Sequence, residues 1–240
     1  MDSSKDAVRC LILMHGSLMS HHKAYIIGSG FFGDRAFYSL QSLFQTASIT
    51  MVDKRFSQLK KIIADGGQAV VMDAVSFLTA SKENLAPDDW IIPAVPIHLA
   101  YEWFRQELKP TSECRTLPVP EALETMLPNT IKGLDGQLYA SNADFICPDD
   151  CPEPDDYCTV TGEPRPQVLS NTLSSLKLPG FYSTCIVSSQ LAPGVGGFQW
   201  SVLPRTLKEI KAHPGKILVG TACKCHCVMH AFLYRPFLSS

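Results

Sequence analysis

The sequence has neither a long hydrophobic run nor an excess of charge of one sign. Its 240 residues carry 21 Lys and Arg against 23 Asp and Glu, a formal net charge of −2. Without a basic field we expect no nucleic-acid partner, and without an apolar run of about 18 residues we expect no membrane span. The hydrophobic content of 45% is enough for a packed core, which excludes wholesale disorder.

The first 20 residues also lack the features of a signal peptide. The apolar stretch from Cys10 to Met14 is short, and no small-residue cleavage site follows it. We interpret residues 1–20 as an N-terminal extension, with Met19 as an alternative start. A cytoplasmic location is the expectation that follows.

Cysteine is absent between Cys10 and Cys114, and this stretch has the pattern of a nucleotide-binding domain. Residues 24–27 form a short apolar run, typical of a buried parallel strand. The run leads directly into a G-x-G-x-x-G motif, in which the first glycine permits a tight turn, the second lets the backbone approach a pyrophosphate, and the third lets the next helix pack on the strand. That helix is expected at about 33–46, with its N-terminal amides directed at the phosphates. The motif consists of Gly28, Ser29, Gly30, Phe31, Phe32 and Gly33.

The second predicted strand, residues 47–52, runs into an acidic residue. Asp53 lies 20 positions after Gly33, where a carboxylate can bond the ribose hydroxyls of an adenosine. Asp53 favours NAD, whereas the cations of Lys54 and Arg55 would accommodate the 2′-phosphate of NADP, so both dinucleotides stay open. A methyltransferase that uses S-adenosylmethionine would share the glycine loop and the acidic residue, but the third glycine favours a pyrophosphate.

Strands and helices keep alternating to the end of this segment, which we assign to residues 21–109. The pattern predicts a helix over 55–65, a strand over 68–72, a strand from Trp90 and a helix over 97–108. Such alternation predicts an α/β fold: a Rossmann-like parallel sheet with helices on both faces and a ligand outside the carboxyl ends of its strands. Ordinary β/α turns would also contain glycine and aspartate, so the nucleotide site remains a hypothesis.

The stretch resembles the RCK-type nucleotide-binding domain of bacterial potassium-uptake regulators. The matching residues are YIIGSGFFG (25–33), MVDK (51–54) and the VVMDA segment (70–74). The resemblance implies that Asp53 holds the adenosine ribose and that Asp73 and Ala74 flank the adenine. It covers about 90 residues with motifs that many dinucleotide-binding families share, so it implies a fold and a ligand class more than a role in transport.

Residues 110–180 differ in composition from the preceding segment, because they contain 10 of the 17 prolines. Neither long helices nor central strands tolerate that density, so we predict an insertion rich in proline and cysteine. Cys147, Cys151 and Cys158 crowd into it, and from Cys147 to Glu163 there are six carboxylates and no Lys or Arg. A loop of this kind has little core of its own, and the closely spaced cysteines indicate that a cross-link holds it in place.

Residues 181–240 return to a β/α pattern. We predict strands over 182–187 and 216–219, the latter leading into a helix over 222–233. This helix would place Cys223, Cys225 and Cys227 at a strand-to-helix turn, with His226 and His230 four apart on one face.

Several interpretations of the cysteines compete. Nine is an odd number and the N-terminus gives little support for an oxidising compartment, which argues against a full set of disulfides. Buried thiols that act as small hydrophobic side chains suit Cys10, Cys114 and Cys185. Six grouped cysteines instead favour a metal site, an iron–sulfur cluster ahead of zinc, or a redox-active dithiol. The predicted ligands are Cys147, Cys151, Cys158, Cys223, Cys225 and Cys227.

Two functions remain open at this stage. The first is an NAD(P)-binding redox protein with a thiolate-ligated metal or iron–sulfur site, an oxidoreductase whose catalytic residues are unknown. The second is a non-enzymatic, nucleotide-sensing regulatory protein with a structural metal. A redox or regulatory protein partner fits either, and oligomerisation stays open. His98, at the start of a predicted helix, is a candidate catalytic residue beside a nicotinamide, although a histidine there is more often structural; His226 and His230 are candidate ligands.

Overall fold

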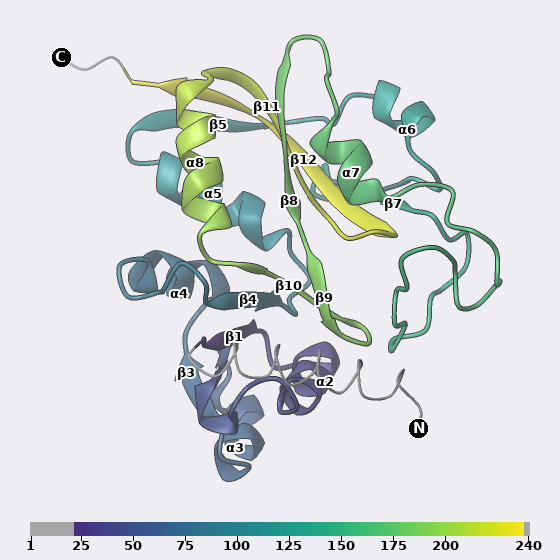
Figure 1. Cartoon of the computed structure of the whole chain (residues 1–240). Coiled ribbons are helices and arrows are strands. Elements are labelled where there is room, and N and C mark those ends of the chain that lie inside the picture. Colours follow the sequence, from purple (N-terminus) through teal and green to yellow (C-terminus); the bar gives the residue numbers. More distant parts are fainter. Residues whose placement is uncertain (1–21, 238–240) are drawn as a thin grey trace.

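The computed structural model describes residues 22–237; the predictions for residues 1–20, including those for Cys10 and Met19, lie outside this range. The chain forms two mixed sheets with helices packed on them, so the predicted α/β class is confirmed. Figure 1 shows the first sheet in the lower half of the molecule and the second in the upper half. Within 22–237, none of the helices combines the length and hydropathy that spanning a bilayer requires.

The first sheet has the order β3-β2-β1-β4-β10-β9. Four parallel strands form its core, in the order that the first half of a doubly wound nucleotide fold uses. Beyond β4 the chain adds an antiparallel hairpin, β9–β10, which the sequence did not predict. The strands are β1 (Ala24–Ile27), β2 (Ile49–Asp53), β3 (Gln68–Val71), β4 (Trp90–Pro93), β9 (Ser189–Ala192) and β10 (Val195–Gln199).

Helices cover both faces of this sheet, as expected. On one face, α2 (Phe31–Leu40) and α3 (Phe56–Ala64) bury apolar side chains against β1 and β2. On the other face lie α4 (Ala74–Ser81) and α5 (Leu99–Leu108). A short 3₁₀ turn, Thr46–Ser48, precedes β2, so α2 ends earlier than the sequence suggested.

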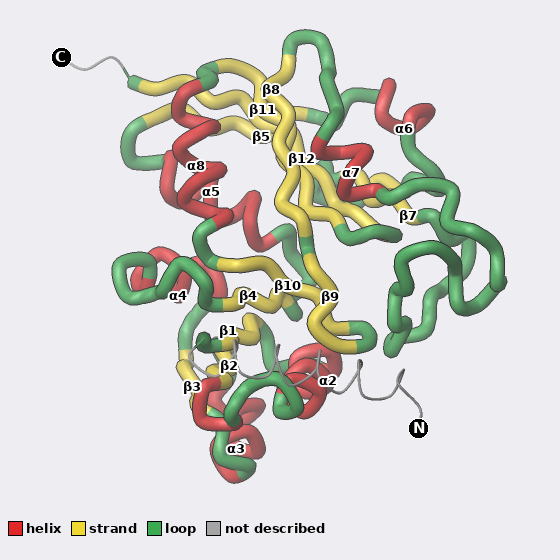
Figure 2. The backbone as a smooth tube through the Cα atoms, viewed as in Figure 1, coloured by secondary structure: helices red, strands yellow, loops and turns green. Residues whose placement is uncertain are grey.

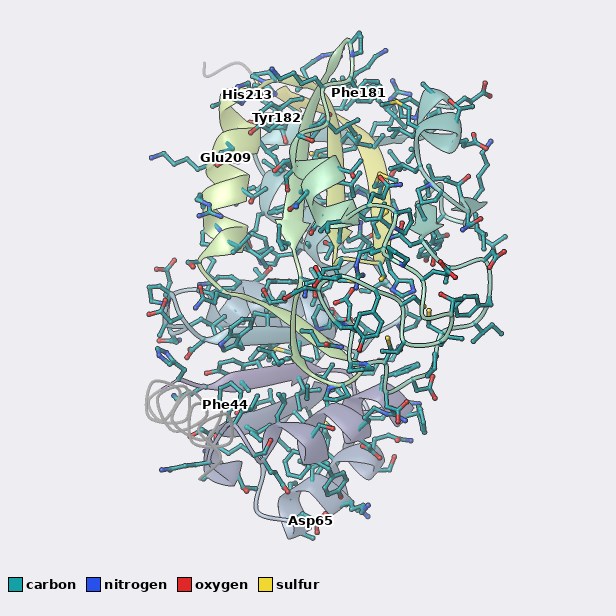
Figure 3. All side chains as sticks on the ribbon, turned by 45° about the vertical axis from the view of Figure 1, so that its right-hand side comes forward. Phe44, Asp65, Phe181, Tyr182, Glu209 and His213 are labelled. Carbon is teal, nitrogen blue, oxygen red and sulfur yellow. The ribbon has the colours of Figure 1, made fainter. Side chains whose placement is uncertain are left out.

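The second sheet has the order β6-β7-β12-β11-β8, and β5 pairs with the far end of β12. Only the β8–β11 pair in it is parallel. Helix α8 packs along β8, where the ring of Tyr182 stacks on His213 at 3.9 Å and its hydroxyl donates to Glu209 at 3.3 Å (Figure 3). The elements are β5 (Ser112–Leu117), α6 (Ala122–Met126), β6 (Ile131–Lys132), β7 (Leu138–Ser141), α7 (Leu169–Ser174), β8 (Phe181–Val187), α8 (Val202–Ala212), β11 (Gly215–Ala222) and β12 (His226–Pro236).

The predicted helix over 222–233 is wrong, because β11 and β12 form an antiparallel hairpin there. Its turn is tight: the N–H of Cys223 donates to the carbonyl of His226 at 3.0 Å. Along β12 successive side chains alternate between two buried cores, with Met229 and Ala231 in one and Phe232 in the other. The segment is therefore apolar on both faces, a pattern that periodicity alone does not separate from a buried helix.

One hydrophobic core joins the two sheets. It contains the inner face of the first sheet, helices α4, α5 and α8, and the facing side of β11 and β12. Trp103 and Phe104 of α5 are buried in it, as are Ile217 and Phe232 of the second sheet. The segments 22–109 and 181–237 thus share a core, which fixes the edge of the first sheet relative to the β11–β12 turn.

Two histidines form the polar centre of this core. The Nδ1 atoms of His98 and His230 lie 3.0 Å apart, and Nε2 of His98 lies 2.9 Å from the hydroxyl of Thr221. The ring of Tyr101 stacks on His230 at 4.0 Å. His98 is 6% exposed and both of its ring nitrogens have partners, so the structure assigns it a role in packing and not beside a ligand.

The proline-rich segment 142–168 is a long loop between β7 and α7, the green stretch on the right of Figure 2. Two hairpin turns hold it. The carbonyl of Cys151 accepts the N–H of Gly194 at 3.0 Å and the side-chain amide of Gln190 at 2.7 Å. On the other side, the carboxylate of Glu153 accepts the N–H of Cys225 at 3.0 Å. Contacts from the β9–β10 and β11–β12 turns therefore replace the core that the loop lacks.

The histidine pair predicts a pH dependence of stability. Burial, with the neighbouring His230 second, lowers the pKa of His98 from 6.5 to about 3, and burial lowers the pKa of His230 to about 4. Below about pH 6.5 the unfolded chain binds more protons than the folded one. The free energy of unfolding is therefore highest above that pH, and it falls as the pH drops toward about 3–4. Each histidine contributes up to about 1.4 kcal/mol per pH unit.

We therefore expect urea unfolding at about pH 5 to give a free energy lower than at about pH 7 by at least about 1 kcal/mol. His230→Gln should flatten this slope, whereas His213→Gln, at an exposed position, should leave it unchanged. A stability that does not vary over this window would contradict the assignment.

The loop anchor predicts a contrast between two glycines of similar backbone conformation. Gly194 has φ +70°, and an added Cβ would lie 1.7 Å from the carbonyl oxygen of Asp149. Gly162 has φ +74° with open space around it. Gly194→Ala should release the loop, seen as faster proteolysis within 147–163, whereas Gly162→Ala should add only a backbone cost of about 1–2 kcal/mol. Equal proteolysis of the two variants would rule out this anchor.

Candidate metal centre and glycine loop

A cavity of about 660 Å³ lies where the proline-rich loop meets the first sheet. Phe32, in the first turn of α2, lines one part of it, and Gly194 and Val195 of the β9–β10 turn line another. The ion pair between Arg35 and Asp149, at 3.9 Å, links α2 to the loop. Five of the six predicted cysteine ligands line this cavity: Cys147, Cys151, Cys158, Cys223 and Cys225.

Four of these thiols form one electrostatic group. Burial and then the charges of Cys151, Cys225 and Cys158 raise the pKa of Cys147. Three of them come from the loop and Cys225 from the β11–β12 turn, so the tertiary structure joins two clusters that are distant in the sequence. All eight cysteines within residues 22–237 have free thiols. Hereafter, the four-thiol group means Cys147, Cys151, Cys158 and Cys225.

Hydrogen bonds favour ionisation of the Cys158 thiol. Backbone N–H groups of Thr161 and Val160 lower its pKa by donating to the sulfur. Thiolate is the form in which a cysteine binds metals. Burial raises the pKa of Cys225, and the guanidinium of Arg165 opposes that effect.

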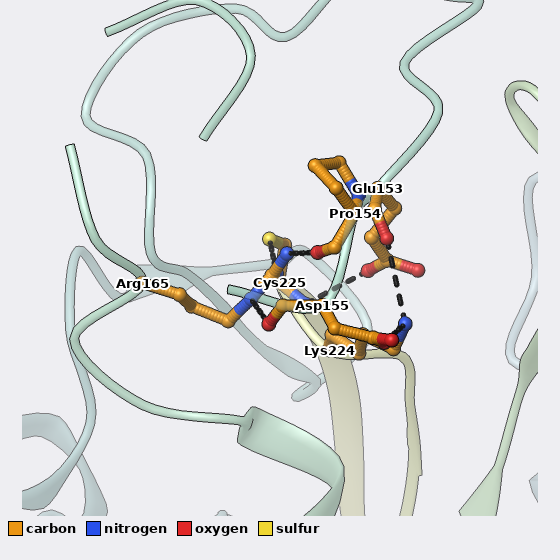
Figure 4. A network of polar contacts seen from close by, with 6 residues as sticks. All are labelled: Glu153, Pro154, Asp155, Arg165, Lys224 and Cys225. Atoms are coloured by element: carbon orange, nitrogen blue, oxygen red, sulfur yellow. Dashed lines mark hydrogen bonds and ion pairs between the residues drawn. The ribbon is translucent and has the colours of Figure 1, made fainter. Parts of the chain in front are cut away.

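Arg165 and Lys224 cross-link the loop to the β11–β12 turn (Figure 4). The guanidinium of Arg165 donates to the sulfur of Cys225 and to the backbone carbonyl of Pro154. The ammonium of Lys224 contacts the carboxylate of Asp155 and, at 3.4 Å, the backbone carbonyl of Glu153. These two cations sit among the six carboxylates of the loop and partly offset their charge. Neither cation was identified from the sequence.

The remaining predicted cysteines lie elsewhere. Cys223 neighbours Glu153 and His226. Cys227 points away from the cavity into the core beneath α7, together with Leu138 and Met229, because neighbouring residues of a strand face opposite sides. The structure does not bring Cys227 to the four-thiol group. Cys114 and Cys185 pack against the hydrophobic cores, as expected of small apolar side chains.

The glycine loop has the expected shape. Gly28 has φ +109°, and a Cβ there would lie 2.4 Å from the carbonyl oxygen of Ala94. A Cβ at Gly33 would lie 2.0 Å from the carbonyl oxygen of Gly28, so the third glycine permits the close approach of α2. Gly30 differs, because its missing Cβ would meet nothing within 4 Å. No protein contact within the described residues therefore requires a glycine at that position.

Asp53 lies at the end of β2 beside this loop. Its Oδ2 accepts the N–H of Ser29 at 3.0 Å and the Ser29 hydroxyl at 2.7 Å, while Oδ1 accepts the N–H and side chain of Arg55. Burial alone would raise the pKa of Asp53, but the hydrogen bonds from Arg55 and Ser29 prevail and lower it to about 2. The carboxylate is thus charged and oriented.

The other predicted nucleotide contacts lie at the same sheet edge. Asp73 caps α4, since its Oδ1 accepts the N–H groups of Val75 and Ser76 at 3.0 and 3.1 Å. Ala74 is the first residue of that helix, and Lys54 is exposed just after β2. Capping accounts for Asp73 without any ligand. Phe31 and Phe32 are 63% and 54% exposed, a large apolar surface at the start of α2.

One acidic residue that lines the cavity, Glu153, was not singled out from the sequence. Glu153 is 9% exposed, although it lies in an exposed loop of six carboxylates. Its ligand atom lies within 4.8 Å of those of Cys223 and His226. The only sequence signal was its position between the two cysteines Cys151 and Cys158. His226 and His230, predicted to share a helix face, lie on β12, where His226 borders the cavity and His230 is buried against His98.

Comparisons with known proteins find one relative and one family model that each match more than half of the chain. A relative in Archaeoglobus fulgidus, named "Uncharacterized protein", is 30% identical over 148 residues. The match covers 60% of this chain and 64% of that protein, so the chain spans slightly less than two thirds of its relative's length.

A family model covers a similar share. The family AF_1314_C, described as "Uncharacterized protein, C-terminal domain", matches residues 100–235. The matched range begins in α5 and includes the proline-rich loop, the second sheet and both hairpin turns, but not the glycine loop. Because this range is more than half of the chain, the protein belongs to the family AF_1314_C, whose matched domain contains the whole four-thiol group.

Proposed function

We propose that this protein is an NAD(P)-binding redox protein in which the four-thiol group holds an iron–sulfur cluster. The observation that carries the proposal is the convergence of four thiols on one cavity beside the glycine-loop helix. Four cysteines are the usual ligand set of an iron–sulfur cluster. A reducing cytoplasm fits this proposal, because it keeps such thiols free for metal binding.

The four thiols are not already gathered at the spacing that a single zinc ion requires. Around one zinc, with Zn–S bonds of about 2.3 Å, four sulfurs lie about 3.8 Å apart. Within residues 22–237, however, the one group of three or more ligand atoms mutually within 4.8 Å is Glu153, Cys223 and His226. The backbone N–H groups that donate to Cys158 would stabilise its thiolate, and the guanidinium of Arg165 would stabilise that of Cys225.

The dinucleotide part of the proposal depends on the glycine loop. The open space at Gly30 and the start of α2 offer a cradle for a pyrophosphate, and Asp53 lies at the ribose position. The RCK-type resemblance of the segment 21–109 supports the same ligand class. Whether the ligand is NAD or NADP depends on the balance between Asp53 and the neighbouring cations Lys54 and Arg55.

The two groups supply complementary chemistry. A nicotinamide donates or accepts a hydride, which carries two electrons, whereas an iron–sulfur cluster transfers single electrons. Exchange between them therefore requires a flavin, either bound here or carried by a redox partner protein. Residues of this chain would orient the dinucleotide at Gly28–Gly33 and keep the cluster partly shielded by the loop.

A second function, a nucleotide-sensing regulator with a structural metal, has one observation in its favour. In α2, Arg35 pairs with Asp149 of the proline-rich loop, and Phe32 lines the cavity that the four-thiol group also lines. A change at the glycine loop would therefore reach the four-thiol group through this helix. Turnover of a dinucleotide by the loaded protein would exclude a pure sensor. Binding without turnover, together with a change in loop protection, would favour it.

The cluster proposal predicts the metal content of anaerobically purified protein. Iron and acid-labile sulfide should be present, with broad visible absorption. Cys158→Ser should lose most of this iron because it removes one ligand, whereas Cys114→Ser, in β5 outside the cavity, should retain it. Metal-free protein, colourless zinc-loaded protein, or full iron content in Cys158→Ser would each refute the cluster.

The dinucleotide proposal predicts that substitution of two glycines affects different properties, ligand binding at one and stability at the other. Gly30→Ala should fold normally because its Cβ has space, yet weaken NAD(H) or NADP(H) binding by at least about tenfold, or about 1.4 kcal/mol, by blocking the pyrophosphate. Gly33→Ala should instead lower the melting temperature, since its Cβ would clash with the Gly28 carbonyl. Calorimetric titration and thermal unfolding measure the two effects. Wild-type affinity in a folded Gly30→Ala variant would contradict the proposal.

A further inference from the structure

We propose that Glu153, Cys223 and His226 hold a single divalent transition-metal ion, at a site separate from the four-thiol group. Their ligand atoms all lie within 4.8 Å of one another, although they come from two parts of the chain. One carboxylate oxygen, one sulfur and one imidazole nitrogen form a mixed donor set that suits zinc or iron. This inference does not depend on what the four thiols bind.

The β11–β12 turn fixes two of the three ligands. Cys223 and His226 flank the two-residue turn of Lys224 and Cys225, and the N–H of Cys223 donates to the carbonyl of His226 at 3.0 Å. The N–H of His226 in turn donates to the sulfur of Cys223 at 3.3 Å, and that sulfur lies 3.8 Å from Nδ1 of His226. The hairpin thus positions a thiol and an imidazole close together, about as far apart as two ligands of one zinc ion.

Glu153 completes the group from the loop. Its backbone has φ +43°, a left-handed conformation that is unfavourable for a non-glycine residue. The carboxylate is buried, and its Oε1 accepts the N–H of Cys225 at 3.0 Å, which orients it toward the turn. The nearby ammonium of Lys224 contacts Asp155 and the backbone of Glu153 instead of this carboxylate. A bound cation would compensate a carboxylate that is buried beside a thiol.

The site has room for an exchangeable ligand. Three protein ligands leave the fourth position of a tetrahedral ion free, as in catalytic zinc sites. Glu153, Cys223 and His226 all line the same cavity as the four-thiol group. A water molecule or an oxygen of a small substrate, such as a carboxylate or carbonyl group, would reach the ion from this cavity.

Cobalt(II) ion is a suitable probe, because thiolate and imidazole ligands give it a characteristic visible and near-ultraviolet spectrum. We would titrate Co²⁺ into the anaerobically purified full chain after dialysis against a chelator. One equivalent should bind with a thiolate charge-transfer band. Glu153→Gln, Cys223→Ser and His226→Ala should each weaken binding by at least about tenfold, and Cys223→Ser should also lose the charge-transfer band. Asp156→Asn, which alters an exposed carboxylate of the same loop, should bind as the wild type does.

Iron and sulfide contents measured on the same samples separate this site from the cluster. Cys158→Ser should lose iron but still bind Co²⁺, whereas His226→Ala should keep iron and lose Co²⁺ affinity. Unchanged Co²⁺ affinity in all three ligand variants would overturn the proposal. So would loss of iron from Cys223→Ser and His226→Ala, which would assign these residues to the cluster. Near-ultraviolet circular dichroism would establish that each variant is folded.

Discussion

The site depends on hydrogen bonds that hold a loop without a core of its own. Segment 142–168 contains prolines, carboxylates and three cysteines, and few of its side chains can be buried. Its carbonyl at Cys151 is bound by the β9–β10 turn and its carboxylate at Glu153 by the β11–β12 turn. Without these donors, ordering such a segment would cost about 1–2 kcal/mol of backbone entropy per residue with little burial to offset it.

Both anchoring turns owe their positions to the core shared by the two sheets. The β9–β10 hairpin extends the first sheet beyond β4, and the β11–β12 hairpin is central to the second. Helix α5 packs between them, with the His98–His230 pair bridging α5 and β12. Since both hairpins are rigid parts of one core, the loop is held at two fixed points. Its thiols therefore meet Cys225 in a defined arrangement.

The same arrangement places the thiols beside the start of α2. Phe32 follows the open position at Gly30 by two residues, and Arg35 is paired with Asp149 of the loop. The helix that follows the glycine loop and the thiols of the proline-rich loop thus line one cavity, although they lie on different elements. The family match covers the thiols and not the glycine loop.

Local pattern was sufficient for much of the first half. The strands at 24–27, 49–53 and 68–71 and the glycine turn follow from short apolar runs and from steric needs that a few neighbouring residues satisfy. Local pattern failed at 222–233, where a segment buried on both faces has no period that separates a strand from a helix.

The grouping of the cysteines was visible in the sequence, but which of them face the cavity and which face the core was not. Cys227 lies on β12 and turns into the core, whereas Cys225 lies in the β11–β12 turn and meets the loop, because strand pairing decides where the strand ends and the turn begins. Glu153 became a candidate ligand only through its backbone conformation and its contact with a turn about 70 residues away. The sequence by itself determined the glycine turn, the parallel strands and the supply of thiols, because these depend on local sterics and composition. Tertiary structure alone decided which thiols meet, because that depends on contacts between distant segments.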